Sequence, residues 1–277
     1  MTVGATRKPL APARLMGVLN VTPDSFSDGG KYLEPQAAVE HALRLAAEGA
    51  DIMDMGAESS RPGSAPVPPD EQLSRLLPVL KAFRRQSRLP VSIDTRSAHV
   101  AHACLDEGAS IINDISALTH DPRLRRVVAR AECDVILMHM QGTPATMQQH
   151  PHYEDVVAEV IAFLRSRIRA CASAGIRGEH VMVDPGIGFG KALEDNLAIL
   201  RRLREFAVLK RPLVVGVSRK SFLGTLTDEP VPERRVAASV AAGLWAVQQG
   251  AAILRVHDVA EHRTALRVAQ ALLQGRR

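Results

Sequence analysis

The sequence predicts a (β/α)8 TIM barrel, formed as a single α/β domain by residues 14–277. Three observations predict it: eight short apolar runs recur along the 277 residues, helical patterns separate them, and several loops that follow the runs are long. A run that is apolar at nearly every position is typical of a strand buried on both faces of a parallel sheet. The runs lie at 14–21, 50–56, 90–95, 110–115, 133–139, 180–185, 212–217 and 251–257.

Between the runs, apolar residues recur at the spacing of one helix face. Eight alternating strand and helix units in 277 residues match a closed barrel. The competing interpretation is an open, doubly wound sheet, but the first run is not followed by the Gly-rich phosphate loop of that fold. The helical spacing is found at Val39, Ala42, Leu43 and Ala46, at Val157, Ile161, Leu164 and Ile168, and at Val236, Val240, Leu244 and Val247.

The connections predict which end of the barrel carries the function. The joints EGAD, EGAS and QGAA, at 48–51, 107–110 and 249–252, are short and place a glycine where a helix ends in a left-handed residue. The loops at 21–34, 56–69, 139–152 and 217–232 follow strands and are long. Long loops above the carboxyl ends of barrel strands mark the functional end. Residues 1–13 are expected to be a disordered extension.

Composition argues against several classes of protein. The hydrophobic content of 46% and charged content of 23% are globular values, and the aromatic content of 3% implies an aliphatic core. The net charge is +5, but the basic residues are scattered, which favours solvated helix faces over a nucleic-acid surface. A modest excess of cations also suits a small anionic substrate. No run approaches the roughly 18 apolar residues of a membrane span, and the first residues lack the apolar core of a signal peptide. We therefore expect a cytoplasmic protein.

Two groups of residues suggest a metal site but lack the spacing of one. Three cysteines, Cys104, Cys133 and Cys171, lie far apart and fit neither a disulfide framework nor a zinc motif. In the loop HMQGTPATMQQHPHYED, at 139–155, the histidines also lack the spacing of a zinc site. We therefore predict no zinc site in the chain.

Polar residues stand where the apolar strands end. Any one of them could be a turn former or a helix cap, but a polar group at the end of strand after strand indicates a binding floor. Carboxylates beside an amide suit a donor-rich heterocycle with an aminopyrimidine edge, and the cations suit a phosphate or pyrophosphate. The strand-end residues are Asn20, Asp94, Asn113, His139, Asp184, Ser218, Arg219, Lys220, Arg255 and His257.

Two further loops are candidates for ligand contacts. DPGIGFGK, at 184–191, fits neither the dinucleotide nor the nucleotide phosphate-loop pattern, because Lys191 and Pro185 stand at required positions. We interpret it as a tight loop that brings backbone, Asp184 and Phe189 up to a flat ring. SSRPGSAPVPP, at 59–69, is either a surface linker or a mobile loop that closes over substrate, and its position after a strand favours the second reading.

Taken together, the motifs resemble those of the dihydropteroate synthase family. They occur in order between residues 16 and 259, over nearly the whole predicted barrel, and differ slightly from the family at Ser60, where a threonine is common. The motifs are MGVLNVTPDSFSDGG, DMGAESSRPGS, VSIDTRS, INDIS, LMHMQGTP, DPGIGFGK, VGVSRKSFLG and LRVHDV.

The resemblance implies a folate-pathway transferase that uses Mg²⁺. It would join 6-hydroxymethyl-7,8-dihydropterin pyrophosphate to 4-aminobenzoate, giving 7,8-dihydropteroate and pyrophosphate. The resemblance also implies a homodimer and a sulfonamide target. Because an arylamine is already a nucleophile, we expect a dissociative substitution with no covalent enzyme intermediate, in which cations and metal stabilise the departing pyrophosphate.

The resemblance also assigns roles to residues. Asp94, Lys220 and Arg255 would be catalytic. Pterin would be bound by Asp94, Asn113, Met138, Asp184, Phe189 and Lys220. Pyrophosphate would be bound by Asn20, Ser60, Arg255 and His257, with Asn20 also meeting Mg²⁺. The 4-aminobenzoate pocket and its loops would use Phe26, Asp28, Arg61, Pro62, Lys220 and Ser221.

Two alternatives from other classes remain open. A pterin-binding methyltransferase barrel would share the floor of Asp and Asn, but it has no need of the Arg61 loop, the SRKSFLG loop or the anion site at Arg255 and His257. A non-catalytic paralogue that binds pterin or another ligand would share every motif. A turnover assay with both substrates separates the three.

Overall fold

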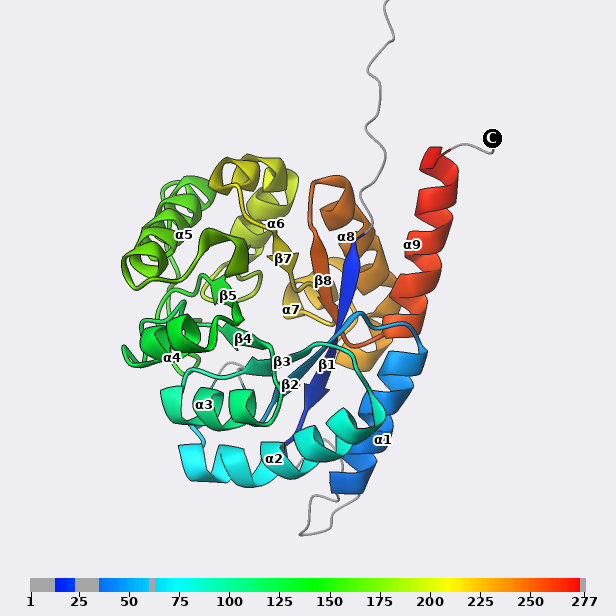
Figure 1. Cartoon of the computed structure of the whole chain (residues 1–277). Coiled ribbons are helices and arrows are strands. Elements are labelled where there is room, and N and C mark those ends of the chain that lie inside the picture. Colours follow the sequence, from blue (N-terminus) through cyan, green and yellow to red (C-terminus); the bar gives the residue numbers. More distant parts are fainter. Residues whose placement is uncertain (1–12, 23–34, 60–62, 275–277) are drawn as a thin grey trace, which may run out of the picture.

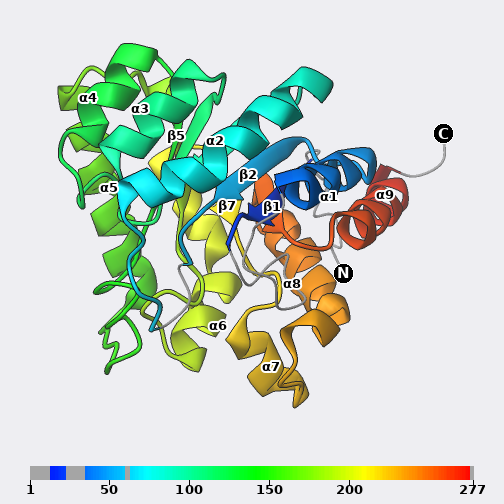
Figure 2. The ribbon, with the colours of Figure 1, turned by 90° about the horizontal axis from the view of Figure 1, so that it is seen from below.

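The computed structural model describes residues 13–22, 35–59 and 63–274. The strands lie at the centre and helices surround them, as two perpendicular views show (Figures 1 and 2). The strands are β1 (Arg14–Asn20), β2 (Ile52–Gly56), β3 (Val91–Asp94), β4 (Ile111–Asp114), β5 (Asp134–Met138), β6 (Val181–Asp184), β7 (Val214–Val215) and β8 (Ile253–Val256). The predicted alternation of strands and helices is confirmed.

Every strand pairing is parallel, and the strands close into a ring. Their order is β6-β5-β4-β3-β2-β1-β8-β7. A parallel bridge between Val183 of β6 and Leu213, just before β7, joins the two ends of this series. The Val183 amide also donates to the Pro212 carbonyl at 3.0 Å. The barrel interpretation is therefore correct and the open sheet is excluded.

The helices lie outside the ring. They are α1 (Pro35–Ala47), α2 (Pro69–Gln86), α3 (Ala98–Asp106), α4 (Leu124–Ala131), α5 (Val156–Ser173), α6 (Leu193–Arg201), α7 (Ser221–Thr227), α8 (Val236–Gln248) and α9 (Val259–Gln274). The glycines of the three short joints, Gly49, Gly108 and Gly250, have φ of +103°, +91° and +107°, as predicted. None of the helices in the described ranges is long and apolar enough to cross a membrane.

One loop contains more structure than the sequence predicts. The segment 217–232 carries the short helix α7, because the side chains of Phe222 and Leu223 are buried and need a helical turn to reach the core. Of the expected extension at 1–13, residues 1–12 lie outside the described ranges, and Ala13 is already buried against the barrel.

The interior of the barrel positions the site. Side chains alternate along a strand, so every second residue points into the ring. An apolar layer fills the lower interior, and two residues further along four of its strands the inward position is polar: Asp54 follows Ile52, Asn113 follows Ile111, Asp184 follows Met182 and Arg255 follows Ile253. On β3 the inward residues Ser92 and Asp94 are both polar. The apolar layer consists of Met16, Ile52, Ile111, Ile136, Met182, Val214 and Ile253.

Candidate active site

A small pocket lies above the apolar layer, at the carboxyl ends of the strands. It gathers side chains from β3, β4, β5, β6 and β8 and from the loops after β6 and β7. The seven residues predicted to bind pterin or to be catalytic all line this pocket: Asp94, Asn113, Met138, Asp184, Phe189, Lys220 and Arg255. Its lining is Asp94, Asn113, Ile115, Met138, Asp184, Gly186, Ile187, Phe189, Gly216, Lys220 and Arg255.

Arg255 lies inside this cluster, in contact with its carboxylates. Its Nε donates to Asp54 Oδ2 at 2.6 Å and its Nη2 donates to Asp94 Oδ2 at 2.9 Å. The two ion pairs place this cation among the carboxylates at the mouth of the barrel. The guanidinium of Arg255 therefore bridges Asp54 and Asp94 at the floor of the pocket.

Asp54 is a site residue that the sequence interpretation missed. Its side chain is fully buried in the middle of β2, and its Oδ2 also accepts from Asn113 Nδ2 at 3.3 Å. A signal was present: Asp54 is the charged residue inside the otherwise apolar strand IMDMG. A carboxylate in a fully buried strand needs a partner, and that requirement predicts a cation across the barrel.

Burial changes the proton affinity of the charged residues in the pocket. Desolvation raises the pKa of Asp94 well above its usual value, with Asp54 adding to the rise and Arg255 opposing it. Desolvation likewise raises the pKa of Asp184, although the Gly186 amide donates to its Oδ1 at 2.7 Å and opposes the rise. The pKa of Lys220 is lowered by desolvation and by the neighbouring Arg255. Such perturbed groups in one pocket are typical of functional sites.

The apolar wall of the pocket is formed around Phe189. Phe189 and Met138 belong to a buried cluster with Ile115 and Met147. Lys220 Nζ lies 4.1 Å from the centre of the Phe189 ring. One side of the pocket is thus formed by an aromatic side chain, a thioether and the stem of a lysine, and the other side by the polar floor.

The loop 185–192 is held in a fixed shape by its own backbone and by two side chains. Gly186 has φ of +69°, and a Cβ built there would lie 1.9 Å from the His139 carbonyl oxygen. Asn196 accepts from the Gly188 amide at 2.6 Å. Buried Lys191 donates from Nζ to the Phe189 carbonyl oxygen and to His139 Nδ1, both at 3.0 Å. The loop is therefore tight, as predicted, and it fixes the positions of Asp184 and Phe189; their contact with a flat ring stays a prediction.

His139 points away from the pocket. Its ring contacts Phe163 edge-on, with centroids 4.9 Å apart, and burial together with the nearby Lys191 lowers its pKa to about 3. A neutral His139 accepts the lysine hydrogen bond. Among the described residues, no group of three or more His, Cys, Asp or Glu side chains is arranged to hold a metal ion.

Lys191 predicts an unusual pH dependence of stability. Burial lowers its pKa to about 7 from 10.5, so the folded chain holds this proton less tightly than the unfolded chain does. The unfolded state then binds more protons between pH 7 and 10.5, and stability contributed by this group rises with pH across that window. Compared with a Lys191→Met variant, the wild type should gain a few kcal/mol between these limits. Thermal melting of both proteins from pH 6.5 to 10 measures the difference; a constant difference would contradict the prediction.

The remaining predicted site residues divide into two groups. Asn20 ends β1 beside Gly56, Ser221 begins α7, and His257 follows β8 with its Nδ1 3.1 Å from Ser218 Oγ. Burial and the adjacent Arg255 lower the pKa of His257 to about 3, so it is neutral at pH 7 and adds no positive charge, contrary to the sequence interpretation. The predicted residues Phe26, Asp28, Ser60, Arg61 and Pro62 lie outside the described ranges.

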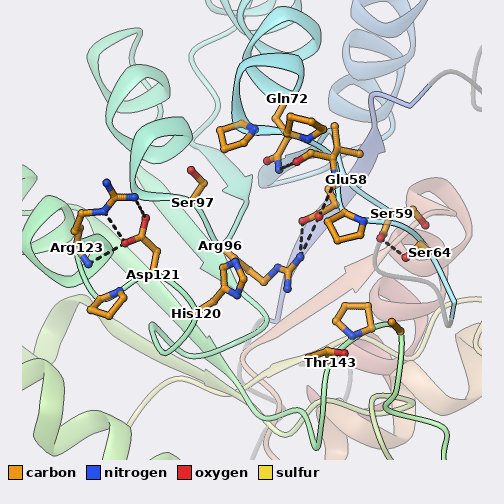
Figure 3. Close-up of a pocket in the computed structure, with 17 residues that line it drawn as sticks. Glu58, Ser59, Ser64, Gln72, Arg96, Ser97, His120, Asp121, Arg123 and Thr143 are labelled. Atoms are coloured by element: carbon orange, nitrogen blue, oxygen red, sulfur yellow. Dashed lines mark hydrogen bonds and ion pairs between the residues drawn. The ribbon is translucent and has the colours of Figure 1, made fainter.

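A larger cavity of about 790 Å³ lies between the loops that follow β2, β3, β4 and β5 (Figure 3). Described residues that line it include Arg96 and Glu58, joined by two hydrogen bonds of 3.0 and 3.1 Å. Glu58 also accepts from the Val67 amide at 3.2 Å, and Ser64 Oγ donates to the Ser59 carbonyl at 2.5 Å. These bonds tie the two described ends of the second loop to each other and, through Arg96, to the loop after β3. The cavity shares no described lining residue with the small pocket.

The sequence matches a known protein family and its members. Residues 16–257 match the family described as pterin binding enzyme. The dihydropteroate synthase of Escherichia coli strain K12 is 44% identical over 271 residues, covering 98% of this chain and 95% of the relative.

Two solved structures are also similar to this chain in sequence and in fold. The Xanthomonas albilineans dihydropteroate synthase with 4-aminobenzoic acid is 48% identical, covers 96% of this chain and 95% of the other, and superposes with a TM-score of 0.91. The same organism's enzyme in complex with 7,8-dihydropteroate is 45% identical, covers 98% of both chains and has a TM-score of 0.87. The chain therefore belongs to the dihydropteroate synthase family of pterin binding enzymes.

Proposed function

We propose that the chain joins a dihydropterin, activated as its methylene pyrophosphate, to the amine of 4-aminobenzoate. One observation carries the proposal: Asp94, Asn113 and Asp184 meet Lys220 and Arg255 in a single pocket at the mouth of the barrel. This set offers acceptors for the amino and ring N–H groups of a pterin and cations for a diphosphate. A barrel mouth is where enzymes of this fold bind their substrates.

The pterin would lie flat between the Phe189 wall and the polar floor. Asp184 is held by the Gly186 amide, so its free oxygen can accept from the amino-pyrimidine edge. Asn113 has an amide that can donate or accept, and its nitrogen is already engaged by Asp54. Lys220, above the Phe189 ring, would donate to the pterin carbonyl or ring nitrogen.

The reaction needs charge stabilisation more than it needs a base. The bond between the methylene carbon and the pyrophosphate oxygen breaks, and its electron pair leaves with the oxygen. The arylamine lone pair then forms the carbon–nitrogen bond, and the nitrogen loses one proton to solvent. Arg255 and Lys220 would stabilise the departing oxygen, and the ionised Asp94 would stabilise the cationic methylene-pterin. This is a dissociative substitution without a covalent enzyme intermediate.

Mg²⁺ would accompany the pyrophosphate. The donor set fits a metal carried by the substrate: Asn20, at the end of β1, offers one amide oxygen, and Mg²⁺ usually takes one or two protein ligands beside phosphate oxygens. The ion would supply Lewis-acid neutralisation of the diphosphate charge. The side chain of Asn20 would hold it at the edge of the pocket where Arg255 also lies.

A turnover assay tests the proposed function. Purified protein is incubated with 6-hydroxymethyl-7,8-dihydropterin pyrophosphate, Mg²⁺ and labelled 4-aminobenzoate, and we expect labelled dihydropteroate and pyrophosphate in equal amounts. A sulfonamide should compete with 4-aminobenzoate. Methyl transfer from a methylated pterin to a cobalamin protein would identify the methyltransferase alternative instead. Pterin binding with no turnover would identify a non-catalytic paralogue.

We further propose that the chain forms a homodimer through α8. Ala237, Ala241 and Trp245 recur at helical spacing on this helix and are all exposed, with Trp245 44% exposed. An apolar line of this kind suits a second copy of the same helix. Sedimentation should show a dimer for the wild type and a monomer for Ala241→Glu, whereas a Gln248→Glu control on the same helix should remain dimeric. Monomeric wild-type protein at micromolar concentration contradicts the proposal.

A further inference from the structure

A buried carboxylate that the proposed reaction does not use lies directly beneath the pocket. Asp54 stands in β2, paired in register with Ser92 of β3, and both side chains are fully buried. Asp54 is absent from the described lining of the pocket, so it does not touch a ligand bound there. A side chain that forms an ion pair in such a position needs a reason, because burial of charge is unfavourable.

Asp54 links two walls of the pocket through a single oxygen. Its Oδ2 accepts from Arg255 Nε on β8 at 2.6 Å and from Asn113 Nδ2 on β4 at 3.3 Å. Its other oxygen, Oδ1, is buried and has no hydrogen-bond partner among the described residues. A buried ion pair is weak evidence for a gain in stability, because removing both charges from water is costly, so folding free energy alone does not account for the choice of this residue.

The geometry of Arg255 indicates what its hydrogen bond to Asp54 does. A guanidinium is planar and carries its donors in a fixed fork, so holding Nε sets the plane of the whole group. Arg255 uses Nε for Asp54 and Nη2 for Asp94. Nε therefore contacts the fully buried Asp54 below the pocket, and Nη2 contacts Asp94, which lines the pocket.

We propose that Asp54 is a positioning residue, which anchors Arg255 by its Nε so that the Nη groups face the diphosphate of the bound substrate. The anchor stays in place when the Nη2 contact to Asp94 is exchanged for a phosphate oxygen, and that exchange frees Asp94 to face the pterin. The same anchor orients the Asn113 amide. This inference rests on the proposed function, because it assumes that Arg255 binds the leaving group.

Pyrophosphate binding and turnover of an Asp54→Asn variant test the anchor. The variant keeps the shape of the side chain but loses its charge. Calorimetry with inorganic pyrophosphate and Mg²⁺ should show binding about ten- to a hundredfold weaker than in the wild type, and kcat should fall by a similar factor. The KM for 4-aminobenzoate should not change, because Asp54 bonds to Arg255 and Asn113, which are not among the residues predicted to bind 4-aminobenzoate. Ser92→Ala, at the same level of the barrel and without a hydrogen bond to Arg255, is the matched control and should behave as wild type.

A double-variant cycle shows whether the effect passes through Arg255. Arg255→Lys keeps a cation but removes the fork that Asp54 holds. If Asp54 acts by anchoring Arg255, the double variant should bind pyrophosphate only slightly less well than Arg255→Lys alone. Additive losses, or an Asp54→Asn variant that matches the wild type in both affinity and kcat, overturn the inference. A wild type without turnover would instead contradict the proposed function.

A measurement on the wild type covers the case in which Asp54→Asn does not fold. The Nε–H of Arg255, assigned by its loss in Arg255→Lys, should give a nuclear magnetic resonance signal that exchanges slowly with solvent. Addition of pyrophosphate should leave this signal in place while the signals of the Nη protons move. An Nε–H that exchanges as fast as that of an exposed arginine such as Arg130 overturns the inference.

Discussion

Asp94→Asn should reduce kcat by about 10² to 10³, the range found when one preorganised electrostatic contact is removed from an active site. The asparagine has nearly the same shape but no negative charge to stabilise the cationic methylene-pterin. It also removes one of the two carboxylates that hold Arg255, at 2.9 Å from Nη2. Steady-state rates with both substrates saturating measure the effect, and binding of pterin alone should weaken far less.

The pH dependence of the same variant gives a second readout. Asp94 acts as its ionised form, and burial raises its pKa, so wild-type activity should be lost as pH falls through a value well above the usual range of an aspartate. Asp184, whose pKa burial also raises, contributes its own loss at acid pH. The Asp94→Asn variant should retain only the loss due to Asp184. The charged groups that act on Asp94 are Arg255, Asp54, Asp114 and Glu58.

Asp114→Asn is the control for this prediction. Asp114 is as deeply buried as the pocket residues and neighbours Asn113 on β4, but it accepts from the Ser116 and Leu118 amides at 2.7 and 2.8 Å, away from the pocket. Its variant should melt at a lower temperature and keep most of its kcat. Full turnover by Asp94→Asn, or a trapped pterin covalently attached to the enzyme, would show that the proposed mechanism is wrong.

The sequence predicts the barrel and most of its pocket because both follow from local patterns. An apolar run that ends in Asp94 or Asp184 signals a buried strand and its polar end within a few residues. Gly49 signals the end of a helix in the same way. Short-range patterns of this kind need no knowledge of which strand lies opposite which.

The parts that the sequence did not predict depend on contacts between distant residues. Asp54 and Arg255 are 201 residues apart in the chain, and only closure of the ring brings their side chains together. The pKa of His257 is lowered by burial and by that same arginine, so its residue type alone suggested a positive charge that the folded chain does not favour. Lys191 resembles a surface lysine in sequence, yet it is buried against the His139 ring.

Gly186→Ala should damage the site without touching any charged group. The backbone of Gly186 has φ of +69°, a conformation that costs an alanine roughly 1 to 2 kcal/mol, and the added Cβ would lie 1.9 Å from the His139 carbonyl oxygen. The loop must move to relieve that contact. Because the Gly186 amide holds Asp184 Oδ1 at 2.7 Å, the carboxylate moves with it. We expect kcat/KM for the pterin substrate to fall at least about a hundredfold, since small displacements of positioning groups have effects of that size.

Gly175→Ala separates backbone strain from displacement of the site. Gly175 has φ of +86°, close to that of Gly186, but a Cβ built there meets nothing within 4 Å, and the residue lies in the joint before β6, whereas the pocket loop follows the other end of that strand. Its variant should lose about 1 to 2 kcal/mol of stability and keep full kcat/KM. Melting curves and steady-state rates of the two variants decide the matter. If both lose the same stability and neither loses activity, the contact with His139 is relieved without moving Asp184, and the rigid loop is not what fixes the pterin-binding carboxylate.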